Sequence, residues 1–168
     1  MWALGHKDHH EKAKGPVAVY VVTVSDTRTE ETDTSGALIR EQLKLGGHSV
    51  TGHVIIPDEP DRIRGVLGSL PGGTQAVIIN GGTGISKRDR TYDAIVKLLD
   101  KEIPGFGELF RALSYNEIGA SAIMSRATAG VMGDTVVVST PGSRGAVSLA
   151  MKEIILPELA HMVWESGR

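Results

Sequence analysis

Residues 75–84 read QAVIINGGTG, an apolar run that ends directly in a glycine-rich loop. Such a run is typical of a strand that is buried on both faces of a parallel sheet. Gly81, Gly82 and Gly84 lack a Cβ atom, so the loop backbone can adopt positive φ and bring its N–H groups close to an anion. The pattern therefore predicts either a plain strand-to-helix turn or a phosphate-binding loop at the end of a central strand.

The same arrangement recurs on both sides of this stretch. Other β-branched or apolar runs end in short polar loops, at residues 17–24, 49–56 and 135–139. Amphipathic helices are predicted between and after them, over residues 34–45, 60–70, 91–99, 106–113 and 147–154. The small-residue segment 119–130 stays unassigned. This alternation predicts an α/β fold, a three-layer αβα sandwich around a mostly parallel sheet.

Ligands of parallel sheets bind outside the carboxyl ends of the strands. Three polar or glycine-rich loops directly follow predicted strands, namely Ser25-Asp26-Thr27, residues 81–91 and Pro141-Gly142-Ser143. We therefore expect these loops to meet at one edge of the sheet.

The segment after the glycine loop carries three cations around one carboxylate. Lys87, Arg88 and Arg90 surround Asp89, and a helix begins near Thr91. Alone these cations indicate a solvated cluster, but next to a glycine loop and a helix start they indicate a phosphate site. Asp89 either pairs with a neighbouring arginine or caps the helix, or it holds Mg²⁺ beside phosphate groups.

Other polar positions also keep two interpretations. Asp58 precedes Glu59-Pro60 and either starts a helix or supplies a second carboxylate for Mg²⁺. Ser143 is either a helix N-cap or a cap whose N–H groups also receive a ligand anion. Ser25, Asp26 and Thr27 either cap a turn or contact ligand. Spacing alone makes Ser125 structural.

Composition restricts the class of protein. The chain has 168 residues, a formal net charge of −2 and 4% aromatic residues, which disfavours nucleic-acid binding. It has no cysteine, hence no disulfide or thiolate nucleophile, and no apolar run approaching about 20 residues that would indicate a membrane span. A cytoplasmic protein is expected, with a flexible polar tail over residues 1–15 and a single domain over 16–168.

Several motifs taken in order resemble the MoaB/MogA family of molybdenum cofactor biosynthesis proteins, in particular its MoaB-like branch. The motifs are Thr23–Arg28, Ile56–Glu59, Gly81–Gly84, Arg88–Thr91, Pro104–Glu108, Ser125–Ala127 and Pro141–Ser143. The resemblance covers essentially residues 16–168. Arg90 departs from the small apolar residues common at its position.

The resemblance implies a three-layer αβα trimer or hexamer that adenylylates molybdopterin with Mg-ATP and releases pyrophosphate. Asp58 and Asp89 match the family's acidic catalytic and Mg²⁺-binding positions. The candidate binding residues, from loops and resemblance together, are Ser25, Asp26, Thr27, Gly81, Gly82, Thr83, Gly84, Arg88, Thr91, Ser125, Pro141, Gly142 and Ser143.

Two other functions stay open. One is a non-catalytic molybdopterin-binding protein of the same pathway. The other is a CinA-type nucleotide pyrophosphatase domain, which normally carries two aspartates where this chain has Arg88-Asp89. An apolar stripe of Phe106, Leu109, Phe110 and Leu113 indicates core or subunit packing, and self-association is expected.

Overall fold

A computed structural model describes residues 15–168, so the predicted tail lies almost wholly outside the described residues. One six-stranded sheet has the order β2-β1-β3-β6-β5-β4. The parallel strands are β1 (Ala18–Val24), β2 (Ser49–Ile56), β3 (Ala76–Asn80) and β6 (Thr135–Thr140). Two further strands complete an antiparallel edge, β5 (Thr128–Met132) and β4 (Lys101–Glu102).

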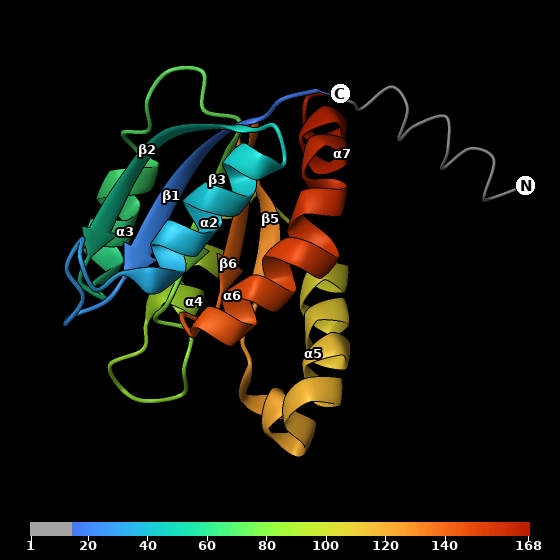
Figure 1. Cartoon of the computed structure of the whole chain (residues 1–168). Coiled ribbons are helices and arrows are strands. Elements are labelled where there is room, and N and C mark those ends of the chain that lie inside the picture. The colour runs from blue at the N-terminus through green and yellow to red at the C-terminus, as the bar shows by residue number, and fades with distance from the viewer. Residues whose placement is uncertain (1–14) are drawn as a thin grey trace, which may run out of the picture.

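Helices cover both faces of this sheet (Figure 1). Those on one face are α2 (Thr34–Leu45), α5 (Pro104–Ile118), α6 (Arg144–Ala150) and α7 (Leu156–Ser166). Those on the other are α3 (Pro60–Leu67) and α4 (Thr91–Val96). A 3-10 helix, η1 (Gly119–Met124), follows α5, and a π-helical turn, η2 (Met151–Ile155), joins α6 to α7.

Side chains alternate along the strands between the two helical layers. On β3, Ile78 packs in the core with α2, α5, α6 and α7, whereas Val77 and Ile79 pack with α3 and α4. All three are fully buried, as a strand covered on both faces requires. The predicted αβα sandwich around a mostly parallel sheet is confirmed.

The sequence located most elements closely, and the differences are local. The helix predicted over 34–45 and the strand over 49–56 have the predicted bounds. The helix from Thr91 is shorter than predicted and ends at Val96, although Leu98 and Leu99 still pack against the core. The unassigned segment 119–130 contains η1 and most of β5, whose pairing with β6 is antiparallel.

The apolar stripe on α5 belongs mainly to the core. Phe106 and Phe110 are buried and Leu113 packs against them, but Leu109 is 48% exposed. Pro104 is the first residue of this helix, as its missing N–H allows.

We predict that Phe110→Ala lowers the free energy of unfolding by about 3–5 kcal/mol, because it leaves a cavity in a closed core. Leu45, which is 82% exposed on α2, provides the control, since Leu45→Ala should change stability by only about 0.5 kcal/mol. Urea denaturation of both variants measures the difference. Equal losses would show that the two side chains share one environment.

Candidate active site

The loops after β1, β3 and β6 meet around a cavity of about 380 Å³, at the lower edge of the sheet in Figure 1. Nine of the predicted site residues line it, namely the candidate Mg²⁺ ligand Asp89 and the candidate binding residues Gly81, Gly82, Thr83, Gly84, Ser125, Pro141, Gly142 and Ser143. The remaining lining residues were not predicted as site residues, namely Thr23, Val24, Arg28, Asn80 and Met124.

The glycine loop has a backbone that only glycine adopts readily. Gly81 has φ of 102° and Gly82 has φ of 63°. A Cβ atom on Gly81 would collide with the carbonyl of Val24, and one on Gly82 with the side chains of Thr91 and Asp58. The loop therefore lies in direct backbone contact with its neighbours, and its conformation depends on these two glycines.

Asp58 holds the end of this segment. Its carboxylate is 5% exposed and accepts hydrogen bonds from the Arg90 N–H (3.1 and 3.2 Å) and the Thr91 hydroxyl (3.0 Å). Burial raises the pKa of Asp58, and the negative charges of Asp89 and Asp26 add to this. The helix predicted after Asp58 does begin at Pro60, but Asp58 does not cap it, because the N-cap is Glu59 and the Asp58 side chain bonds to the start of α4 instead.

Asp89 faces the cavity without pairing with either neighbouring arginine. Its Oδ2 accepts from the N–H (3.1 Å) and the hydroxyl of Ser86, while the N-cap of α4 is Arg90. Arg88 instead pairs with Asp26 at 2.6 Å, and this hydrogen bond lowers the pKa of Asp26. The predicted arginine pairing and helix capping by Asp89 are therefore wrong.

The carboxylates can be tested against the requirements of Mg²⁺. Asp89 Oδ1 accepts no hydrogen bond from the described residues, whereas both oxygens of Asp58 are engaged. Residues 15–168 contain no group of three His, Asp or Glu side chains arranged for a metal ion. Mg²⁺ commonly takes one or two carboxylates and completes its shell with phosphate and water oxygens. Asp89 fits that role directly, and Asp58 fits a supporting one.

Arg126, which lies shortly before β5 in the chain, holds the glycine loop in place by hydrogen bonds. Its guanidinium donates to the carbonyls of Thr83 (3.0 Å), Gly84 and Asp89 and also pairs with Asp93 (3.0 Å). No local pattern predicts this contact, because the partners are separated by 33 to 43 residues. Arg126 therefore positions the loop that carries Asp89.

Arg28 holds the loop after β6 in place in a similar way. It donates to the Gly142 carbonyl at 3.1 Å and to the Ser35 hydroxyl at 3.0 Å, and Ser35 itself donates to the same carbonyl at 2.8 Å. Arg28 also lines a second, adjacent cavity of about 780 Å³. The two cavities thus share one cation.

The other predicted residues lie around these cavities. Ser25, Asp26 and Arg88 line the second cavity, and the Ser25 hydroxyl accepts from the N–H groups of Thr27 and Arg28, as a turn cap does. Thr27, Asp58 and Thr91 line neither cavity. Ser143 accepts from the Ala146 N–H as the N-cap of α6 and also lines the first cavity.

Within the described residues, no helix combines the length and apolar character needed to cross a membrane.

The fold and the glycine loop define the class as an α/β protein with a glycine-lined cavity at the carboxyl ends of its strands. The family described as "probable molybdopterin binding domain" matches residues 20–161. Molybdenum cofactor biosynthesis protein B of Bacillus subtilis (strain 168) is 55% identical over 162 residues, which is 95% of each chain. The chain belongs to this molybdopterin-binding family, in its MoaB/MogA group and MoaB-like branch.

Solved structures agree with this membership. A crystal structure of molybdenum cofactor biosynthesis protein B is 54% identical, with a TM-score of 0.88 over 92% of this chain and 98% of that one. The tungsten cofactor synthesizing protein MoaB from Pyrococcus furiosus is 36% identical, with a TM-score of 0.83 over 92% of this chain and 99% of that one.

We predict that Gly142→Ala weakens binding of pyrophosphate about tenfold or more, since a Cβ atom there would lie 2.9 Å from the Gly81 Cα and push two loops apart. Gly145→Ala is the matched control, because a Cβ atom at Gly145 meets no atom of the described residues within 4 Å. It should keep the affinity and stabilise α6 by up to about 1 kcal/mol. Calorimetric titration measures the pyrophosphate affinity of both variants. Unchanged binding by Gly142→Ala would show that the contact between these two loops does not affect ligand binding.

Proposed function

We propose that this chain acts in molybdenum cofactor biosynthesis by transferring the adenylyl group of Mg-ATP to the terminal phosphate of molybdopterin. An oxygen of the molybdopterin phosphate attacks the α-phosphorus of ATP. The bond from that phosphorus to the bridging oxygen breaks, and pyrophosphate leaves with the electron pair. Membership in a molybdopterin-binding family supports the role in cofactor biosynthesis.

The observation that carries the proposal is the placement of Asp89 beside the glycine loop in a cavity of about 380 Å³. Phosphate oxygens are already ionised at neutral pH, so the transfer needs no strong general base. It needs two polyanions held in line and their charge neutralised. A glycine loop, a cation and an available carboxylate oxygen are the groups for that task.

Each group then has a role. The N–H groups of the loop after β3 bind phosphate oxygens, as expected of backbone at positive φ. Arg28, at the border of the two cavities, neutralises charge between the substrates. Asp89 would hold Mg²⁺, which when bound would supply further charge neutralisation on the phosphates. Asp58 keeps Arg90 and Thr91 against the loop and so positions Asp89.

A non-catalytic molybdopterin-binding role is the second candidate, and one observation favours it. Both oxygens of Asp58 already accept hydrogen bonds, so only Asp89 has an available carboxylate oxygen among the two predicted Mg²⁺ ligands. The CinA-type alternative has less support, because Arg88 stands where that domain carries an aspartate and is paired with Asp26.

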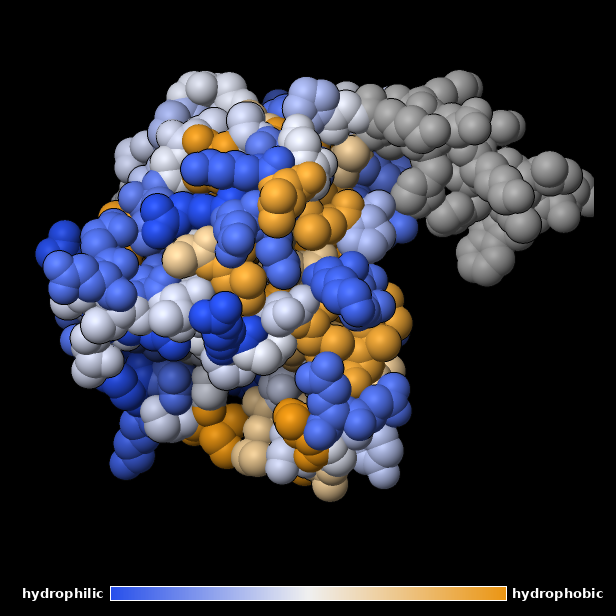
Figure 2. Space-filling model, viewed as in Figure 1, coloured by the Kyte–Doolittle hydropathy of each residue, from blue (hydrophilic) through white to orange (hydrophobic). Residues whose placement is uncertain are grey.

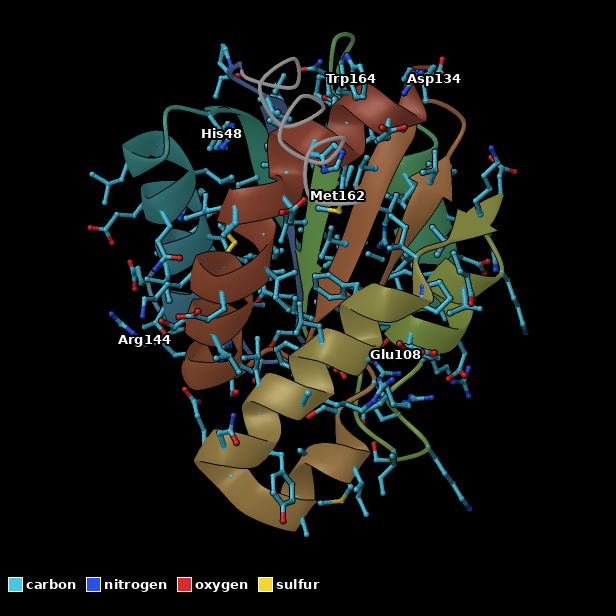
Figure 3. All side chains as sticks on the ribbon, turned by 90° about the vertical axis from the view of Figure 1, so that its right-hand side faces the viewer. His48, Glu108, Asp134, Arg144, Met162 and Trp164 are labelled. Carbon is cyan, nitrogen blue, oxygen red and sulfur yellow. The ribbon has the colours of Figure 1, made fainter. Side chains whose placement is uncertain are left out.

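We predict that Asp89→Asn lowers adenylyl transfer about a hundredfold or more, because an amide is a poor Mg²⁺ ligand. The assay incubates the chain with molybdopterin, Mg²⁺ and α-labelled ATP and follows label onto the pterin. Asp134→Asn is the control, since Asp134 is exposed at the opposite edge of the molecule (Figure 3). Near wild-type adenylyl transfer by Asp89→Asn would show that Asp89 only stabilises the turn and does not take part in catalysis. Tight molybdopterin binding by the wild type without any transfer would support the non-catalytic role.

We further propose that the chain forms a homotrimer or homohexamer. Five apolar side chains of α5 and η1 are 48–81% exposed and make up what we call the α5–η1 patch, namely Leu109, Tyr115, Ile118, Ile123 and Met124. Figure 2 shows apolar residues gathered on the right-hand part of the face where Figure 1 places α5 and α7, and Figure 3 shows α5 and η1 facing the viewer. Exposed apolar surface of this extent is typical of a subunit interface.

We predict that light scattering finds an oligomer at micromolar concentration and that Ile123→Glu shifts it toward the monomer. Burying a charge in an apolar interface is strongly unfavourable, while the folded monomer keeps the 81% exposed position. Leu45→Glu is the control, because Leu45 is 82% exposed on α2, outside the patch. A stable wild-type monomer would refute the proposal.

A further inference from the structure

Asn80 has an amide orientation that its neighbours determine. The Nδ2 group donates to the Val22 carbonyl (3.2 Å) and to the Thr23 hydroxyl (3.0 Å). A backbone carbonyl can only accept, so the amide nitrogen must face it. The Thr23 hydroxyl in turn donates to Asp33 (2.6 Å) and is therefore free to accept from Asn80. These contacts fix Oδ1 on the other side of the amide.

The Oδ1 atom of Asn80 is a buried acceptor without a partner among the described residues. Asn80 is 1% exposed and lines the 380 Å³ cavity. Buried polar atoms are nearly always hydrogen-bonded, so such an atom in the wall of a cavity indicates a donor that arrives with a ligand. Among residues 15–168, Asn80 is the only residue lining this cavity that has an unpartnered buried side-chain atom.

A second unpartnered atom lies on the neighbouring strand. Thr140 is the register partner of Asn80 on β6, and both side chains project from the same face of the parallel pair. Its hydroxyl is buried and also lacks a partner within the described residues. Thr140 does not line the cavity, so only Asn80 of the two can meet a ligand there.

A phosphate group does not suit this position. An ionised phosphate offers only acceptor oxygens, which would face the Oδ1 dipole unfavourably. The N–H groups of the glycine loop, which starts at the next residue, are the better partners for phosphate. The cavity therefore has two chemically different sides. The glycine loop offers N–H groups that suit an anion, and Asn80 offers an oxygen that suits an N–H donor.

We propose that Asn80 Oδ1 binds the exocyclic amino group of a fused nitrogen heterocycle and thereby helps to select the substrate. The identity of the ligand rests on the proposed function, since pterin and adenine both carry such an amino group. Asn80 acts as a specificity residue for the ring, and the glycine loop serves the phosphate.

The first test compares ligands on the wild-type chain by calorimetric titration. The probes are 6-hydroxymethylpterin against 6-hydroxymethyllumazine, which has an oxo group in place of the amine, and adenosine against purine riboside, which lacks the amine. One amino heterocycle should bind roughly fivefold or more tightly than its amine-free counterpart. The pair that differs identifies the source of the ring. Equal affinities within both pairs would overturn the proposal.

The second test uses Asn80→Leu, which removes the acceptor at similar volume. The preference for the amine should disappear, while inorganic pyrophosphate should bind as it does to the wild type, which also reports a folded glycine loop. Ser139→Ala is the matched control, because it removes another unpartnered buried oxygen one residue before Thr140, on the opposite face of the sheet. It should keep the preference.

Two outcomes of the second test would overturn the proposal, namely an amine preference that survives in Asn80→Leu or one that disappears equally in Ser139→Ala. If Asn80→Leu does not fold, the comparison of ligands on the wild-type chain decides alone. None of these titrations requires turnover. An amine preference without adenylyl transfer would therefore keep this inference and refute the enzymatic function. Adenylyl transfer without an amine preference would refute this inference and keep the enzymatic function.

Discussion

The close approach of three backbone loops is the constraint on which the site depends. Gly81 lies against the carbonyl of Val24 on β1, and a Cβ atom at Gly142 would lie 2.9 Å from the Gly81 Cα. Neighbouring strand ends can come this near only where side chains are missing. The hydrogen bond from the Gly81 N–H to the Thr140 carbonyl (3.0 Å) then joins the loop to β6. The cavity is the space that remains once these contacts are made.

The arginines of the site hold the loops in place as well as carrying charge. Arg28 and Arg126 donate to backbone carbonyls of the loops, and Arg88 pairs with Asp26 across the second cavity. A cation held by several acceptors has little freedom to reorganise when an anion arrives, and such preorganisation is what makes electrostatic stabilisation effective. Each of these three arginines is also paired with a carboxylate, namely Arg28 with Asp33, Arg126 with Asp93 and Arg88 with Asp26.

Much of the fold could be predicted from the sequence because its signals are local. A buried strand such as Ala76–Asn80 and a helix such as Thr34–Leu45 follow from residue periodicity and from the residues that end them. The antiparallel edge of β4 and β5 has no such signal, since β4 is two residues long. The loops of the site could be predicted from their position after strands. The partners of Asp58, Arg28 and Arg126 could not, because those contacts join residues brought together only by the sheet order.

The two ends of the loop after β3 are held very differently from its tip. Arg126 secures the carbonyls of Thr83, Gly84 and Asp89, whereas residues 85–88 are exposed and reach the rest of the chain through the Arg88–Asp26 pair. An ion pair between exposed side chains contributes roughly 0–1 kcal/mol and is screened by salt. The tip is thus held to the rest of the chain by one contact that salt weakens, whereas the ends of the loop are held by hydrogen bonds to Arg126 that salt affects far less.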